Sequence, residues 1–147
     1  MSRQLPNESS LAETARLLLV VEFDVARFTD VRREVDSRSR ECRISPEKAD
    51  DFVAAVNEIM INAIRHGGGR GELRLWQDAQ LTCEIRDHGP GFAADNYLNR
   101  AHRPSPSADG GMGLWIVQTT SDTLSIVSDP TGTTVVIGAT LTPIDAG

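Results

Sequence analysis

The segment NEIMINAIRHGGG, residues 57–69, contains three polar side chains that could take part in chemistry. They are Glu58, Asn62 and His66, and they are spaced four residues apart. An α-helix turns by about 100° per residue, so residues four apart stack along one edge. In a helix over this segment an acid, an amide and an imidazole would share that edge. The apolar residues of the same predicted helix fall in a different sector, which predicts a buried face made of Phe52, Val56, Ile59, Met60 and Ala63.

Asn62 is the most informative member of this row. Asparagine is a mediocre helix former, so in mid-helix its carboxamide needs either exposure or a partner. An amide oxygen suits Mg²⁺, an ion that commonly bridges protein oxygens to substrate phosphates. Glu58, one turn earlier, is placed to accept a proton from an attacking hydroxyl or water, or to orient it. The alternative is a polar helix edge that faces solvent.

A first glycine-rich segment, DHGPGF at 87–92, puts Asp87 at the end of a predicted strand, with Gly89 and Gly91 following at alternate positions. Glycines spaced in this way let a backbone approach a ligand closely. A carboxylate can accept a hydrogen bond from an amine such as the exocyclic N6 of adenine. The alternative is an ordinary Gly-Pro turn.

A second glycine-rich segment, DGGMGLWIV at 109–117, places Gly110, Gly111 and Gly113 at the start of a predicted helix. Free backbone N–H groups and the helix dipole attract phosphate at such a position. Glycines precede many helices, so this segment alone is a weak signal. Together the two segments are compatible with a nucleotide site.

Several other kinds of site are excluded by the sequence. Lys48 is the single lysine and no glycine precedes it, so a Walker A loop cannot form. The signatures of ordinary protein kinases and the Gly-x-Ser-x-Gly elbow are absent. Cys42 and Cys83 form no CxxC pair, and the three histidines lack metal-binding spacing, so neither a disulfide framework nor a zinc site is expected.

Periodicity and turn residues predict the elements that would position these side chains. Ser45 as N-cap, Pro46 as first helical residue and the glycines from Gly67 bound one helix clearly. Alternating apolar residues on either side of two tight turns predict two hairpins. The expected elements are a strand at 14–23, helices at 25–42 and 46–66, strands at 71–78 and 80–87, a long loop, a helix at 112–122, and strands at 123–129 and 133–141. This order predicts an α+β two-layer sandwich, a mainly antiparallel sheet covered by helices on one face.

Length and composition indicate one folded domain, which we expect to span residues 13–143, while the polar residues 1–12 are expected to fray. The chain has 147 residues, 39% hydrophobic and 24% charged. Its net charge of −6 disfavours a nucleic-acid partner. The longest apolar run, LLLVV at 17–21, is too short to cross a bilayer, and the N-terminus lacks the pattern of a secretion signal. We therefore expect a cytoplasmic protein with no membrane partner.

In order and context, these segments resemble the Bergerat-fold ATP-binding domain of the GHKL superfamily, which includes gyrase B, histidine kinases and mismatch-repair ATPases. NEIMINAIRHG is similar to the N box, DHGPGF to the first glycine box, GGMGLWIV to the second, and GTTVVI to the final strand with its ligand-facing threonine. The resemblance implies that the chain binds ATP and Mg²⁺.

The resemblance also implies a role for individual residues. Glu58 would be the catalytic base and Asn62 the Mg²⁺ ligand. The residues implied at the nucleotide are Asp87 for the adenine amine, Gly89 and Gly91 beside the base, Gly111, Met112, Gly113 and Leu114 for the phosphates, and Thr133 assisting at the adenine. The loop 93–109 would be the ATP lid, and its Arg100 and Arg103 would reach phosphates or face solvent.

Within the superfamily, the short second box and the layout before the N box resemble those of bacterial anti-sigma-factor serine/threonine kinases. Asp109 stands where histidine kinases usually have the first glycine of Gly-x-Gly-x-Gly. The resemblance implies a kinase that binds a sigma factor, phosphorylates an anti-anti-sigma antagonist and forms a homodimer. The alternatives are a detached histidine-kinase-like catalytic domain acting in trans, and a nucleotide-dependent binding module without kinase turnover.

Overall fold

The fold is known from a computed structural model that describes residues 15–91 and 111–143, apart from the side chains of residues 111 and 112. The described elements, in chain order, are β1 (Arg16–Asp24), α2 (Phe28–Arg40), α3 (Pro46–His66), β2 (Arg70–Gln77), β3 (Gln80–Asp87), α4 (Gly111–Thr120), β4 (Thr123–Asp129) and β5 (Gly132–Thr140). The predicted order of strands and helices is confirmed.

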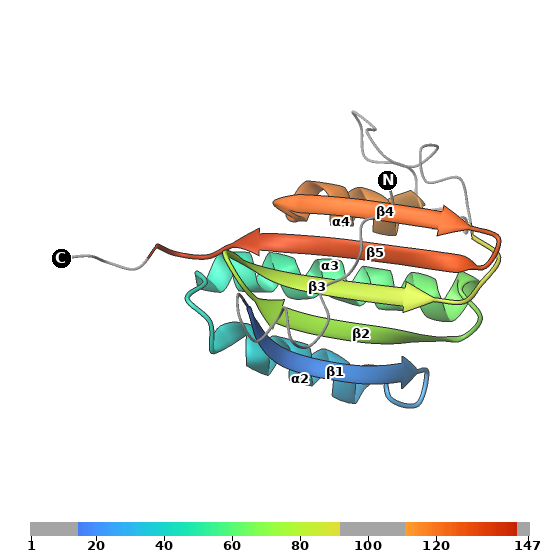
Figure 1. The fold of residues 1–147 in the computed structure, drawn as a ribbon, viewed down its shortest axis with the longest axis horizontal. Helices are drawn as coiled ribbons and strands as arrows, with labels where there is room; N and C mark the ends of the chain where they lie inside the picture. The colour runs from blue at the N-terminus through green and yellow to red at the C-terminus, as the bar shows by residue number, and fades with distance from the viewer. Residues whose placement is uncertain (1–14, 92–110, 144–147) are drawn as a thin grey trace.

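The strands form one five-stranded sheet in the order β1-β2-β3-β5-β4, and every neighbouring pair is antiparallel. The helices of the described residues, α2, α3 and α4, all lie behind the same face of this sheet (Figure 1). This confirms the predicted two-layer α+β fold. No helix in these ranges is both long and apolar enough to span a membrane.

Helix α3 begins and ends where the sequence predicts. The Ser45 hydroxyl accepts a hydrogen bond from the Lys48 backbone N–H at 3.2 Å, and Pro46 occupies the first turn, where no N–H is needed. At the other end the Gly67 N–H donates to the Ala63 carbonyl at 2.9 Å. The chain then turns through Gly68, whose φ of +91° is a conformation that favours glycine. These caps fix the helix that carries the row of polar residues.

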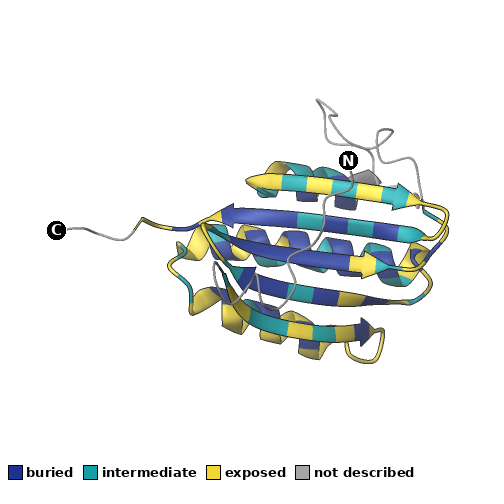
Figure 2. Ribbon diagram, viewed as in Figure 1, coloured by how far each residue is buried: buried dark blue, intermediate teal, exposed yellow. Residues whose placement is uncertain are grey.

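The core lies between the sheet and the helices. The predicted buried face of α3 is confirmed, with each of its members at most 3% exposed. It packs against inward-facing residues of the central strands, which form the most buried part of the sheet (Figure 2). Burying one such large apolar side chain contributes about 1.5–3 kcal/mol. The largest fully buried members of the core on these strands are Leu73, Leu75, Leu81, Ile85 and Ile137.

Two helices are shorter or shifted relative to their predicted ranges. The Arg27 N–H donates to Asp24 Oδ1 at 3.0 Å, so a turn occupies the chain before α2 begins at Phe28. The Asp122 N–H donates to the Gly138 carbonyl of β5 at 3.0 Å. Because this N–H bonds to the sheet, it is not part of a helix, and α4 ends at Thr120. Helical periodicity alone does not reveal such competing hydrogen bonds.

Glu84 is a buried acid at the centre of the sheet, on the face away from the helices. Its side chain is 6% exposed, and Oε2 has no hydrogen-bond partner within residues 15–91 and 111–143. Burial raises the pKa of this carboxyl above its ordinary value, although the neighbouring Arg74 and Arg86 oppose the shift. The charged form therefore reduces the stability of the fold at neutral pH.

Replacing Glu84 with glutamine should raise the free energy of unfolding near pH 7 by about 1 kcal/mol. Because the folded-state pKa is raised, the wild type gains stability as pH falls through that pKa toward the ordinary value of about 4.3, and the variant does not. Urea unfolding at several pH values measures both effects. Glu22→Gln, an exposed acid on β1, is the control and should change stability little. A wild type and Glu84→Gln variant with parallel pH profiles would contradict the assignment.

Candidate functional site

At one end of the sheet a row of five neighbouring residues crosses all five strands. In spatial order they are Phe23, Gly71, Asp87, Thr133 and Ser128. The buried Phe23 and Thr133 place this row on the side covered by the helices. The row is apolar at β1 and polar from β3 onward. It therefore brings an acid and two hydroxyls together at the rim of the helical layer.

The Asp87 carboxylate is held in one orientation by the backbone. Its Oδ1 accepts hydrogen bonds from the Gly89 N–H at 3.0 Å and the Thr133 N–H at 3.2 Å. Its Oδ2 is on the side of Gly67, where an added methyl group would lie 2.5 Å away. Within residues 15–91 and 111–143, Oδ2 receives no hydrogen bond. This oxygen is available to accept one from an N–H group of a ligand.

Three turns pack together around this carboxylate, and they do so through glycines. A methyl group on Gly89 would lie 2.5 Å from the Gly67 Cα atom, so the first glycine segment lies directly on the end of α3. Gly91 has a φ of +78° and lies against the Asp129 carbonyl in the β4–β5 turn. Gly132 in the same turn lies against the carbonyl of Asp87. These contacts fix the Asp87 side chain relative to α3.

Since the resemblance implies that Asp87 binds adenine, replacing Gly67 with alanine is expected to weaken adenine-nucleotide binding by about tenfold or more. The same change should destabilise the fold by about 1–3 kcal/mol. The backbone of Gly67 has a φ of −106°, so alanine meets no conformational strain there. Its methyl group would instead collide with the Asp87 carboxyl. Calorimetric titration with ADP and thermal unfolding measure the two effects.

Gly69→Ala is the control that distinguishes the effect of a steric contact with Asp87 from the effect of backbone strain. Gly69 has a φ of +87°, but a methyl group there would have no neighbour within 4 Å. This variant should lose stability without a matching loss of nucleotide affinity. Equal affinity losses in the two variants would show that the Gly67 contact with Asp87 is not the cause.

The other end of the polar edge of α3 reaches the second glycine segment. A methyl group on Gly113 would lie 2.9 Å from Glu58 Oε2, which places this carboxylate against the first turn of α4. Glu58 is half-buried, and burial raises the pKa of its carboxyl. Asn62, also half-buried, lies one turn further along α3, and Gly67 lies at the helix end beside Asp87. One helix edge therefore links both glycine segments.

Helix α4 begins at Gly111, so the backbone N–H groups of residues 111–114 belong to its first turn, where intrahelical acceptors are missing. The Leu114 side chain is 4% exposed, which leaves its backbone as the group that could face a ligand. His66 is the exposed last residue of α3. Arg100, Arg103 and the predicted lid at 93–109 lie outside the described residues.

The donor set around Asn62 is compatible with a loosely held Mg²⁺. Within the described part of the chain, the Asn62 carboxamide makes no hydrogen bond, so its oxygen can serve as a ligand. In the same residues no group of three or more His, Cys, Asp or Glu side chains is arranged to hold a metal. A Mg²⁺ ion here would depend on phosphate oxygens and water for most of its ligands.

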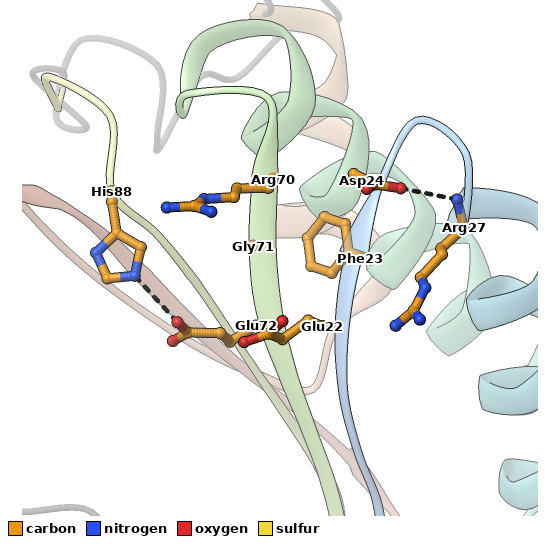
Figure 3. A pocket seen from close by; sticks show the side chains of 8 residues that line it. All are labelled: Glu22, Phe23, Asp24, Arg27, Arg70, Gly71, Glu72 and His88. Carbon is orange, nitrogen blue, oxygen red and sulfur yellow. Dashed lines mark hydrogen bonds and ion pairs between the residues drawn. The ribbon is translucent and has the colours of Figure 1, made fainter.

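A separate cavity of about 390 Å³ opens at the same end of the sheet, over β1 and β2 (Figure 3). His88 lines it, and the His88 Nε2 atom lies 3.1 Å from Glu72 Oε1. Two further acids and two arginines share the lining, so the cavity has no single sign of charge. Neither Asp87 nor Thr133 lines it, and we assign it no ligand.

Sequence reasoning missed two residues of this site. Ser128 was not singled out, yet its hydroxyl lies 2.7 Å from that of Thr133. Gly67 was predicted only as a helix stop, although it also lies against Asp87. The hairpin itself carried a signal for Ser128, since a two-residue turn at 130–131 pairs Ser128 with Thr133. No comparable signal pointed to the contact of Gly67.

The chain is similar to known proteins over most of its length. Residues 21–138 match the family described as Histidine kinase-like ATPase domain. A probable sensor histidine kinase HK of Mycobacterium tuberculosis is 27% identical over 120 residues, covering 76% of this chain and 32% of the relative. The sensor histidine kinase component HK1 of the same species is 30% identical over 101 residues, covering 63% of this chain and 60% of the relative. The chain thus spans less than two-thirds of the length of either relative.

Solved structures share the fold at low sequence identity. The structure of the RsbU and RsbW domains of Rv1364c from Mycobacterium tuberculosis has a TM-score of 0.58 at 18% identity, covering 84% of this chain and 31% of that one. The mycobacterial sensor histidine kinase MprB has a TM-score of 0.54 at 21% identity, covering 86% of this chain and 100% of that one. The matched region covers most of the chain, including all of β2, β3 and β4 and parts of β1 and β5. The chain belongs to the histidine kinase-like ATPase domain family of the GHKL superfamily.

Proposed function

We propose that this domain binds Mg²⁺ and ATP and transfers the γ-phosphoryl group to a serine or threonine of a partner protein. The observation that carries the proposal is the edge of α3. It places Glu58 against the second glycine segment and ends at Gly67 beside the anchored Asp87 carboxylate. A nucleotide lying along this edge would have its amine near the Asp87 carboxylate, which can accept a hydrogen bond from it. Its phosphates would lie near the backbone N–H groups in the first turn of α4.

Each group has a defined task in this proposal. Asp87 Oδ2 accepts a hydrogen bond from the adenine amine, with Gly89, Gly91 and Thr133 at the base. The backbone N–H groups of residues 111–114 hold phosphate oxygens. Asn62 contributes an oxygen to Mg²⁺, which when bound would neutralise charge on the phosphates. Glu58 accepts the proton of the attacking hydroxyl, so catalysis consists of positioning and proton transfer.

We further propose that the partners are a sigma factor, which the domain sequesters, and an anti-anti-sigma antagonist, which it phosphorylates. The support is the short second glycine segment, in which Asp109 replaces the first glycine usual in histidine kinases. We also propose that the domain spans residues 13–143, that it forms a homodimer and that it lies in the cytoplasm.

A second function is favoured by a specific observation, because both curated relatives are named as sensor histidine kinases. In that case the domain would phosphorylate a histidine. His66 ends α3, and His88 lies within the first glycine segment with its Nε2 atom 3.1 Å from Glu72 Oε1, so both are at the proposed site. His102, in the predicted lid, lies outside the described residues. We propose that in this case the acceptor histidine is supplied in trans.

Incubation with γ-³²P-ATP, Mg²⁺ and candidate antagonist proteins distinguishes these functions. Label that survives acid and is recovered as phosphoserine or phosphothreonine would support the proposal. Acid-labile label would support phosphorylation of a histidine. ATP binding with no label on any partner would instead indicate a nucleotide-dependent binding module. Omission of Mg²⁺ is the control and should abolish transfer.

A further inference from the structure

Ser128 and Thr133 form a hydroxyl pair at the polar end of the five-strand row. They face each other across β4 and β5, and their Oγ and Oγ1 atoms are 2.7 Å apart. Either atom can be the donor in this hydrogen bond. Thr133 is 4% exposed, and its backbone N–H donates to Asp87 Oδ1. The pair is thus joined directly to the carboxylate proposed to bind the base.

We propose that Ser128 is a positioning residue that orients the Thr133 hydroxyl as a donor, and so makes the site selective for adenine among the purines. This inference rests on the proposed nucleotide-binding function. It adds a residue that neither the motif segments nor the family match assigns.

The direction of the hydrogen bond follows from the chemistry of the base. An ionised Asp87 only accepts hydrogen bonds, so it must face a donor. Adenine presents an amine donor at C6 beside an acceptor at N1, whereas hypoxanthine and guanine present an oxygen acceptor beside an N1–H donor. In this proposal the amine lies on Asp87 and the N1 edge of the base faces the neighbouring Thr133. The group facing Thr133 is then an acceptor, and Thr133 must donate to it.

A threonine hydroxyl has one proton. If Thr133 gives that proton to the base, it can keep its 2.7 Å contact with Ser128 only as the acceptor. Ser128 must therefore donate to Thr133. With the opposite direction, the Thr133 oxygen would offer a lone pair to the base and would favour an N1–H purine. The orientation of one serine proton thus decides between two classes of base.

The β4–β5 turn holds this pair in place. The Thr131 N–H donates to Asp129 Oδ1 at 2.7 Å, which closes the turn one residue beyond Ser128. Gly91 lies against the same turn, and a methyl group there would be 3.0 Å from Ser128 Oγ. The serine is therefore fixed by the hairpin and by the first glycine segment. A pair fixed before the ligand arrives loses less entropy on binding.

The test compares ADP with 1-deaza-ADP, in which a C–H group replaces the N1 acceptor. Affinities are measured by isothermal titration in the presence of Mg²⁺ for the wild type, Ser128→Ala and Ser128→Thr. Loss of one hydrogen bond of ordinary strength corresponds to about a two- to tenfold change in affinity. The wild type should prefer ADP by such a factor, Ser128→Ala should lose most of that preference by binding ADP more weakly, and Ser128→Thr should retain it.

Ser125→Ala is the matched control, because Ser125 is an exposed residue of the same strand that pairs with Val136. It should leave both affinities unchanged. An unchanged preference for ADP in Ser128→Ala, even with a lowered melting temperature, would reduce Ser128 to a structural role and overturn the inference. A wild type that binds ADP but not more tightly than 1-deaza-ADP would also overturn it. A wild type that binds neither nucleotide would overturn the proposed function, and this inference with it.

Discussion

Asp87→Asn is expected to weaken ADP binding by about a hundredfold while leaving the fold intact. The carboxylate uses Oδ1 to accept hydrogen bonds from Gly89 and Thr133, and asparagine can keep both with its remaining oxygen. The amide nitrogen then replaces Oδ2 and presents a donor to the donor amine of adenine. Flipping the amide does not help, because the nitrogen would then face two backbone N–H groups. Isothermal titration with ADP and Mg²⁺ measures the loss.

Asp78→Asn is the matched control for this substitution. In the β2–β3 turn Asp78 Oδ1 accepts a hydrogen bond from the Gln80 N–H at 2.8 Å, as Asp87 Oδ1 does from Gly89. Asp78 Oδ2 also accepts one from the Trp76 indole N–H at 3.2 Å. The control should bind ADP as the wild type does, and both variants should unfold in a single transition. If Asp87→Asn bound ADP with wild-type affinity, the ligand assigned to Oδ2 would be wrong.

The framework of the site was predictable because its signals are local. Ser45 and Pro46 start α3 and the glycines from Gly67 end it, through interactions between residues at most four apart in sequence. The buried face of α3 follows from helical periodicity, and the strand order within each hairpin follows from alternation and short turns. Such features are encoded within a single element. The sequence therefore predicts which side chains share the edge of α3.

The contacts that orient the site were not predictable in the same way, because they join separate elements. Gly67 meets Asp87 only when the end of α3 lies over β3, and Thr133 meets Asp87 only in the observed register of β3 and β5. A shift of one residue would turn Thr133 to the other face of the sheet. The buried Glu84 likewise depends on cross-strand packing. Its position in an alternating strand predicts exposure, whereas the side chain is 6% exposed.

Glu58→Gln is expected to lower the rate of phosphoryl transfer by about 10²- to 10⁴-fold, with the affinity for ATP close to that of the wild type. Glutamine keeps the shape of the side chain against Gly113 but cannot accept the proton of an attacking hydroxyl. Single-turnover transfer of ³²P from ATP to the partner protein measures the rate. Glu47→Gln is the control, since Glu47 is an exposed acid in the first turn of the same helix.

The rate of phosphoryl transfer should also depend on pH through the ionisation of Glu58. Burial raises the pKa of Glu58, so the carboxyl takes up its proton at a higher pH than an exposed glutamate, whose pKa is about 4.3. Because the base must be ionised, the wild-type rate should fall as pH decreases through this raised pKa. The residual rate of Glu58→Gln should not change over the same range. Wild-type and variant rates that remained equal, or that fell together with pH, would show that another group accepts the proton.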